Sequence, residues 1–425
     1  MWQASPRRGW DRLLQKAHEG QGFWGSQRAL LSAIDNFVRK PAVLTTGAPH
    51  VRDAVDLKRT MVLVVIALLP CLLFGIYNTG RGAYLSVGHE GFTLWQAMLE
   101  GALHVLPLVL LSYAVGGACE ILFAQLRGHE VAEGFLVTGL LYPLVCPATI
   151  PWWMFALGIV FGVVIGKEVF GGTGMNMLNP ALLARAFVFF AYPAHMSGEV
   201  WIASPVRAAP DGGLTPAKWT TIPRELIERF ISGGGGAAPD GYSGPTALAL
   251  VNESAPGGGD VLAALRGTYP WWDCFWGFVP GSIGETSTAM CLLGAAVLII
   301  TGIGSARTML GCVIGCVVTS ALFYPFSGAE APVAFGLTPL EHLVMGGFAF
   351  GAVFMATDPV SSPFHPTSRF IYGCCIGSLC VLIRLVNPAY PEGMMLAILF
   401  MNVFAPLIDH YVVEARLRRR AAHAY

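Results

Sequence analysis

Ionisable side chains within apolar stretches are the residues of this sequence best placed to do chemistry. Charged groups are costly inside a membrane and usually serve a function there. Asp358 is the strongest candidate, because Thr357-Asp358-Pro359 interrupts an apolar segment and could gather a carboxylate and free carbonyl groups around a cation. For each acid the alternative is a structural partner or an interfacial position, and we expect the two arginines to pair with these acids or to bind an anionic group. The full set is Glu120, Arg185, Glu285, Asp358, Arg384 and Asp409.

A glycine-rich segment is a second candidate. The residues from Gly166 to Gly174 include four glycines, and Asn176 and Asn179 follow. Glycine turns leave backbone N–H groups open to a ligand, and asparagine both donates and accepts hydrogen bonds, which suits the dione edge of an isoalloxazine ring. Tight packing between broken helices would explain the same residues, so both interpretations stay open.

A third feature is the stretch from Asp240 to Leu248, which reads as a turn followed by a small hydroxyl residue at the start of an apolar run. On chemistry alone, Thr246 there is a helix N-cap or a simple loop residue.

The elements that position these residues must lie in a membrane. Charged residues make up 12% of the chain, against about 25% in a soluble domain. Apolar residues make up 54% and the mean hydropathy is +0.59. The apolar runs are continuous rather than alternating, which excludes a β-barrel, and the balanced net charge of zero gives no case for nucleic-acid binding. The ten cysteines never form a CxxC pair, which favours packing roles.

The pattern predicts an all-α polytopic membrane protein with about ten transmembrane helices in two groups of five. A polar, Gly/Pro-rich stretch separates the groups. We expect spans near 59–77, 99–125, 134–149, 152–167, 176–193, 284–303, 307–326, 340–356, 370–386 and 393–412. The domains are then an N-terminal arm (1–57), a first five-helix repeat (58–193), a central loop (194–283), a second repeat (284–412) and a basic tail (413–425).

Basic residues predict the orientation. The first 59 residues carry ten Lys and Arg, and the tail carries Arg416, Arg418, Arg419 and Arg420. Both ends should therefore be cytoplasmic, which places the central loop on the outer face. Leu30, Leu31, Ile34, Phe37 and Val38 predict an amphipathic helix in the arm, either on the membrane surface or docked on a neighbouring subunit.

The two groups of spans look related. Gly134-Phe135, Gly139, Pro147 and Pro151 recur about 212 residues later as Gly347-Phe348, Gly351, Pro359 and Pro363. Because each group has an odd number of spans, the second copy should be inverted, as in a urea-transporter-like fold. Inverted repeats place sites where broken helices meet near the midplane.

Longer motifs now identify a relationship. The chain resembles the B-type subunits of the sodium-translocating NADH:quinone oxidoreductases over nearly its whole length. The stretches that carry the resemblance run from Arg52 to Met61, Gly166 to Pro180, Val279 to Glu285, Phe354 to Ser361 and Val386 to Met395.

The resemblance implies one membrane subunit of a redox-driven Na⁺ pump in the bacterial inner membrane. Its partners would be five other subunits, of the A, C, D, E and F types, and a flavin transferase. The enzyme would be an NADH:ubiquinone reductase in which this chain carries covalent FMN and non-covalent riboflavin and passes electrons to ubiquinone, coupled to Na⁺ translocation.

The resemblance also implies roles for particular residues. The flavin-attachment pattern matches Asp240, Ser243, Gly244 and Thr246, so Thr246 should be the FMN-linked threonine. Pro245 departs from the usual alanine, and its fixed φ could alter the fit to the transferase. Riboflavin is expected against Lys167, Asn176 and Asn179. A quinone site matches Gly116, Gly117 and Glu120. The intramembrane acids match Asp358 and Asp409, with Asp358 and Glu120 as the Na⁺ ligands.

Two other functions share these features. The D-type subunit of an ion-translocating ferredoxin:NAD⁺ complex would have the same fold and covalent flavin but no quinone site. A channel or transporter of the urea-transporter kind would bind no flavin. The charged N-terminal arm and the residues from Gly116 to Glu120 favour the quinone enzyme over both.

Overall fold

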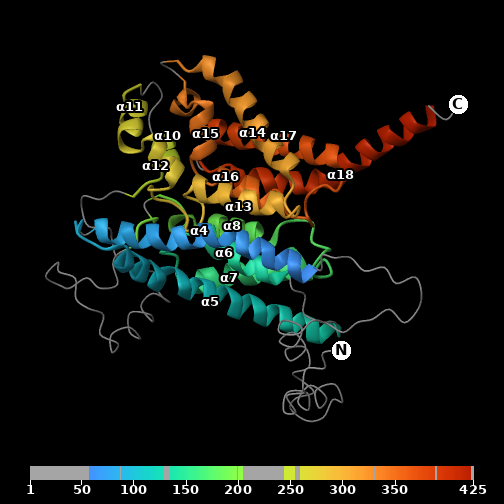
Figure 1. The fold of residues 1–425 in the computed structure, drawn as a ribbon, viewed down its shortest axis with the longest axis horizontal. Helices are drawn as coiled ribbons and strands as arrows, with labels where there is room; N and C mark the ends of the chain where they lie inside the picture. Colours follow the sequence, from blue (N-terminus) through green and yellow to red (C-terminus); the bar gives the residue numbers. More distant parts are fainter. Residues whose placement is uncertain are drawn as a thin grey trace, which may run out of the picture.

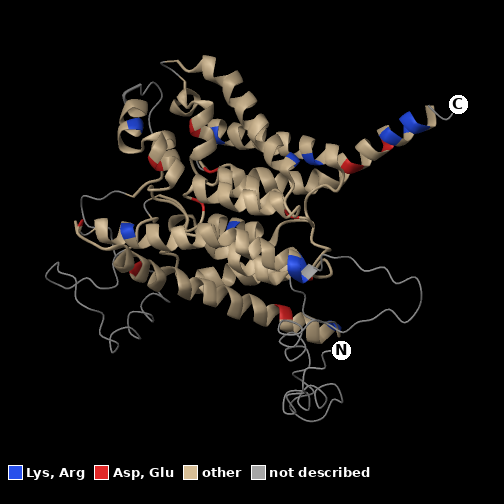
Figure 2. Cartoon of the chain, viewed as in Figure 1, with Lys and Arg blue, Asp and Glu red and all other residues tan. Residues whose placement is uncertain are grey.

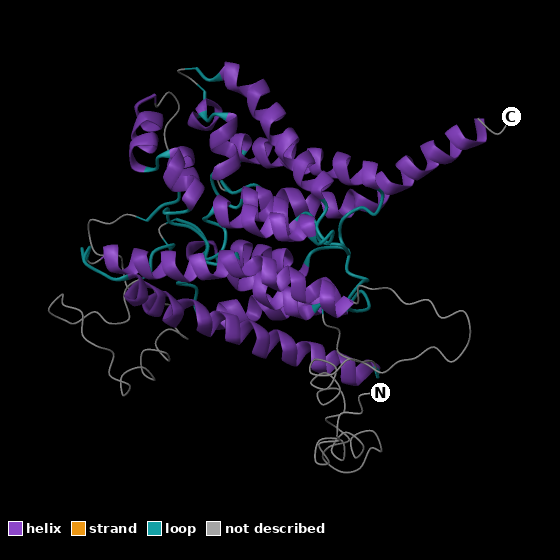
Figure 3. Cartoon of the chain, viewed as in Figure 1, coloured by secondary structure: helices purple, strands orange, loops and turns teal. Residues whose placement is uncertain are grey.

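The computed structural model describes most of the chain beyond the N-terminal arm. The described residues are 57–86, 88–128, 134–198, 200–203, 244–253, 259–328, 331–387 and 390–422. Within these ranges the chain forms helices and loops and no strand (Figure 3). The predicted amphipathic helix, most of the central loop, Asp240 and Ser243 lie outside the described residues.

The first group of helices follows the predicted apolar runs closely. The last helix but one, α7, continues as a π-helical turn, η1, and the loop after it carries the glycine-rich segment. The elements are α4 (Leu57–Ser86), α5 (Leu94–Arg127), α6 (Phe135–Leu144), α7 (Trp152–Val163), η1 (Val164–Glu168) and α8 (Pro180–Ala191).

The second group has the same alternation of long and broken helices. Three short helices precede it: α10 (Ala247–Glu253), α11 (Gly259–Thr268) and α12 (Trp271–Trp276). The group itself comprises α13 (Thr288–Ile300), α14 (Ala306–Phe323), α15 (Pro339–Val344), α16 (Phe348–Phe350), the π-helical turn η5 (Gly351–Met355), α17 (Pro366–Val386) and α18 (Met394–Ala422).

The helices confirm an all-α polytopic membrane fold. Five of them, α4, α5, α14, α17 and α18, are long and apolar enough to cross a membrane. The predicted span 340–356 is broken between α15 and α16, because Gly346 takes a left-handed φ of 64° there. The shorter helices α6, α8 and α13 end earlier than the predicted spans. The ten-span count and the inverted repeat stay predictions.

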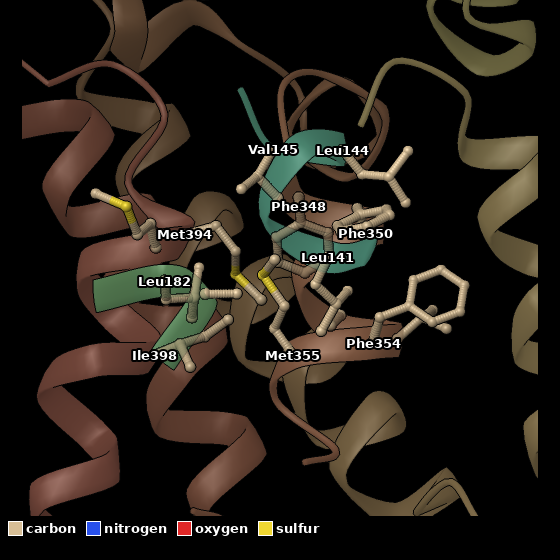
Figure 4. Packing of buried hydrophobic residues seen from close by; sticks show 14 of the residues in the cluster. Leu141, Leu144, Val145, Leu182, Phe348, Phe350, Phe354, Met355, Met394 and Ile398 are labelled. Carbon is tan, nitrogen blue, oxygen red and sulfur yellow. The ribbon is translucent and has the colours of Figure 1, made fainter. Parts of the chain in front are cut away.

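The two groups of helices lie side by side and pack as one body. Figure 1 shows α4 to α8 on one side and α13 to α18 on the other, with α4 packed along α13. The broken helices share a single core, in which Leu141 and Leu144 of α6 lie beside Phe350 of α16 and Phe354 of η5 (Figure 4). In Figure 2 basic residues gather at the free end of α18, away from this core.

Glycines allow the closest helix crossings. A Cβ atom at Gly377 of α17 would lie 2.0 Å from the carbonyl oxygen of Cys312 on α14, and one at Gly315 would lie 2.1 Å from that of Cys374. Both helices carry glycines four residues apart, at 311 and 315 and at 373 and 377. In a membrane such small residues let backbones approach and replace the missing hydrophobic driving force with close packing.

We predict that Gly377→Ala lowers the midpoint of thermal unfolding in detergent, because the added methyl group must push α14 away from α17. The expected cost is about 1–3 kcal/mol. Gly82→Ala on α4 is the matched control, since its Cβ would meet no atom within 4 Å. Equal midpoints for the two variants would contradict so close a crossing of α14 and α17.

Candidate functional site

A large hollow between the two helix groups brings several of the predicted site residues together. It encloses about 740 Å³, including space open to solvent, and its wall contains Lys167, Asn176, Asn179 and Asp358. Lys167 comes from the π turn η1, the asparagines from the glycine-rich loop, and Asp358 from the loop after η5. We call this space the inner hollow, because it lies at the end of the molecule where α4 begins. Both helix groups contribute to it.

Asn179 joins the two helix breaks. It is the N-cap of α8, where its side-chain Oδ1 accepts hydrogen bonds from Ala181 N at 3.0 Å and Leu182 N at 3.3 Å, and Pro180 follows at the first helical position. Its Nδ2 donates to Asp358 Oδ2 at 3.4 Å. One amide therefore ends the glycine-rich loop and also contacts the acid of the opposite group.

The carboxylate of Asp358 is held by neutral donors. Val360 N donates to its Oδ1 at 3.2 Å, and Ser361 Oγ donates to its Oδ2 at 2.9 Å. No lysine or arginine of the described ranges forms an ion pair with it. No group of three or more His, Cys, Asp or Glu residues in those ranges could hold a metal ion. A cation beside Asp358 would therefore also need carbonyl or hydroxyl oxygens, which suits a weakly bound monovalent ion better than a transition metal.

Two ion pairs attach the π turn η1 to α5. Lys167 Nζ contacts Glu120 Oε1, and these two side chains are only 2% and 4% exposed. Arg127 Nη1 lies 3.2 Å from Glu168 Oε2, and its other terminal nitrogen donates to the Glu168 carbonyl oxygen. A π turn inserts an extra residue into a helix and often occurs at functional sites. Glu120 thus lies just behind the wall of the inner hollow, in contact with Lys167.

The glycines near these groups have two different explanations. Gly171, Gly172 and Gly174 have positive φ values of 120°, 96° and 94°, so the loop itself requires them. A Cβ at Gly116 would lie 2.3 Å from the ring of Phe135, so that glycine serves the packing of α5 on α6. At Gly117 the nearest atom would be 3.8 Å away, an ordinary contact. The predicted quinone role of Gly116 and Gly117 stays a prediction.

Asp409 lies apart from the inner hollow. Its two carboxylate oxygens accept hydrogen bonds from Phe364 N at 2.7 Å and His365 N at 3.1 Å, at the start of α17. It therefore holds the end of the loop that carries Asp358. A direct role of Asp409 in ion transfer stays a prediction.

A second hollow opens beside Thr246 at the opposite end of the molecule. This outer hollow encloses about 390 Å³, including open space, and its wall includes Thr246, Ser282, Thr286, Glu285 and Glu392. Thr246 Oγ1 accepts from Ala249 N at 3.2 Å, which confirms the N-cap interpretation. The buried Thr286 Oγ1 has no hydrogen-bond partner among the described residues. The Pro245 carbonyl oxygen accepts from Tyr269 at 3.0 Å, and Gly244 packs against Ile202.

Sequence reasoning missed two hydroxyl groups of these walls. Thr173 Oγ1 is buried in the inner hollow and has no partner among the described residues, as Thr286 Oγ1 has none in the outer one. Thr173 stands inside the glycine-rich motif itself. A hydroxyl residue flanked by glycines that the loop requires was the available signal for it.

The two buried arginines behave differently. Arg185 of α8 pairs with Glu285 of the other helix group at 2.9 Å, as predicted for an arginine near these acids. Arg384 instead donates to main-chain carbonyl oxygens, of His342 at 2.7 Å and of Met345 at 2.8 Å. It satisfies the end of α15 at the helix break.

We predict that Arg185→Met destabilises the chain by about 3–5 kcal/mol, because it leaves the Glu285 carboxylate buried without its partner. The double variant Arg185→Met/Glu285→Gln should recover most of this loss in thermal unfolding. Arg266→Met, which breaks a pair with an arginine side chain that is 46% exposed, is the control and should cost at most about 1 kcal/mol. Additive losses in the double variant would contradict a direct interaction.

Comparisons with known proteins agree with this architecture. A model of the NQR2, RnfD, RnfE family matches residues 44–418. A protein from Chromohalobacter salexigens, named as the B-type subunit of Na(+)-translocating NADH-quinone reductase, is 45% identical over 96% of this chain and 94% of its own length. Proteins of the same name from Pseudomonas aeruginosa and Azotobacter vinelandii are each 44% identical, over 92% and 93% of this chain and 93% of their own lengths. The chain therefore belongs to the NQR2, RnfD, RnfE family.

Proposed function

We propose that this chain is the B-type subunit of a sodium-translocating NADH:quinone oxidoreductase in the bacterial inner membrane. It passes electrons from FMN on Thr246, through riboflavin, to ubiquinone, and couples this transfer to Na⁺ movement. The observation that carries the proposal is the inner hollow, where Lys167, Asn176 and Asn179 of one helix group meet Asp358 of the other. Polar flavin-binding groups and a carboxylate suited to Na⁺ thereby share one wall.

The positions of the two hollows support a two-ended path. The inner hollow is lined by Thr60 near the start of α4 and by Gly304 after α13. The outer hollow lies beside α10 and α12, at the other end of the long helices. The start of α4 and the free end of α18 lie toward the same side in Figure 1, which agrees with two cytoplasmic termini. Riboflavin is then held near the cytoplasmic face and FMN near the outer face.

Both hollows fit the proposed groups. In the inner hollow, the orphaned hydroxyl of Thr173 and the side chains of Asn176 and Lys167 offer polar contacts to riboflavin within an otherwise apolar wall. In the outer hollow, the orphaned hydroxyl of Thr286 offers a partner to FMN on Thr246, whose oxygen can keep its N-cap bond as an ester. A bound flavin supplies the one-electron and two-electron redox chemistry. The chain supplies orientation, exclusion of water and fixed charge.

The partners follow from the names of the relatives. Proteins 44 to 45% identical to this chain are named as the B-type subunit of the complex, so we assign it five partner subunits, of the A, C, D, E and F types, and a flavin transferase that modifies Thr246. Glu120, with Gly116 and Gly117, is assigned to the quinone site. The acids assigned to the ion path are Asp358, Glu120 and Asp409, with Asp358 as the first Na⁺ ligand.

We predict that Thr246→Ala abolishes in-gel flavin fluorescence of the denatured chain when the host also makes the flavin transferase. Thr246→Ser keeps a hydroxyl group at the same place and is the matched control, which should remain fluorescent. Fluorescence in the alanine variant would move the attachment elsewhere, such as Ser243. No fluorescence in the wild type, with another substrate labelled, would mean that Pro245 blocks modification.

We predict that Asp358→Asn slows quinone reduction and raises the Na⁺ concentration for half-maximal rate about tenfold, equivalent to about 1.4 kcal/mol of binding free energy. The amide removes the charge that attracts the cation but keeps the size of the side chain. Glu341→Gln is the control, because that acid pairs with Arg266 away from both hollows. An unchanged Na⁺ dependence in Asp358→Asn would remove Asp358 from the ion path.

A further inference from the structure

We propose that Lys167 supplies the counter-charge that sets how readily the flavin of the inner hollow is reduced, and that Glu120 tunes this charge through its ion pair with Lys167. Both act as positioning residues for charge. This inference rests on the proposed function, because it requires a flavin in the inner hollow.

The geometry places Lys167 between two surroundings. Its side chain lines the inner hollow together with Asn176 and Asp358, while its Nζ contacts Glu120 Oε1 on α5 behind the wall. Both side chains of the pair are almost completely buried. A lysine that only fastened two helices would not need to form part of the wall of a hollow.

Few charges face this hollow. Among its lining residues, which all belong to the described ranges, Lys167 and Asp358 are the only ones that carry a formal charge. Glu120 offsets Lys167 from behind, whereas Asp358 contacts only neutral donors. The second ion pair of η1, between Arg127 and Glu168, does not line the hollow.

Reduction brings negative charge into a site of low dielectric constant, where a nearby fixed charge acts strongly. The ammonium group of Lys167 favours that charge, and the carboxylate of Glu120 reduces the benefit. Removing Lys167 and removing Glu120 should therefore change the reduction equilibrium in opposite directions. Removing both groups takes away a neutral pair and should change it little. A purely structural pin would give two changes of the same sign.

The experiment uses the assembled complex in four forms: wild type, Lys167→Gln, Glu120→Gln and the double variant. Redox titration at a fixed Na⁺ concentration follows each flavin by its absorbance. The non-covalent flavin is quantified separately after denaturation. Arg127→Gln is the matched control, since it breaks the neighbouring ion pair of the same π turn.

In Lys167→Gln we expect the equilibrium constant for reduction of one flavin couple to fall about tenfold, equivalent to about 59 mV for one electron. In Glu120→Gln the same constant should rise by a similar factor, and in the double variant it should return to within about threefold of the wild type. Arg127→Gln and the other flavins of the complex should not change. Lys167→Arg keeps the charge and should behave as the wild type.

Shifts of the same sign in the two single variants, or no shift with flavin still bound, would overturn the inference and leave the proposed function intact. Absence of non-covalent flavin from the wild-type complex would instead refute the proposed function. If the single variants fail to assemble, the swapped variant Lys167→Glu/Glu120→Lys keeps the ion pair and places a carboxylate at the hollow. It should lower the reduction constant, and an unchanged constant would overturn the inference.

Discussion

The hydrogen bond from Asn179 to Asp358 is the contact on which the rest of this arrangement depends. A membrane supplies no water to backbone groups at a helix break, so each break must be satisfied by the protein itself. Asn179 satisfies the start of α8 with its Oδ1 and contacts the break after η5 with its Nδ2. The two irregular segments can therefore face each other across a polar hollow without leaving the backbone unsatisfied there.

The charges of the molecule obey the same constraint. Arg185 pairs with Glu285, and Lys167 pairs with Glu120, each time between two almost completely buried side chains. Such pairs contribute little net stability, because desolvation offsets most of their attraction, but loss of one partner is costly. Their value is therefore geometric, since each pair fixes which surfaces of neighbouring elements meet. The charge of Asp358 is held by neutral groups alone, which distinguishes it electrostatically from the paired acids.

Local signals made much of the fold predictable, and long-range contacts did not. Continuous apolar runs predicted the helices, and Asn-Pro and Thr-Asp-Pro predicted breaks at Asn179 and Asp358, because a helix requires particular residues at its ends. The pairing of Glu120 with Lys167 joins residues 47 positions apart, and no pattern in the chain indicates it. The role of Arg384 was likewise hidden, since main-chain carbonyl groups are present at every residue and leave no mark in the sequence.

The two broken helices also explain why the hollows can communicate while remaining separate. Leu141 of α6 lines the inner hollow, and one turn later the Leu144 carbonyl oxygen accepts from Gly284 N, next to the outer wall. In the other group Phe354 lines the inner hollow and Gly347 the outer one. The side chains between them form the apolar core of Figure 4, which offers a hydrated ion no substitute for its water. A charge on either side therefore meets a barrier in this closed form, whereas electron transfer needs no such substitute. Coupling the two then requires the helix breaks to move, and the contact between Asn179 and Asp358 is where such a movement would have to begin.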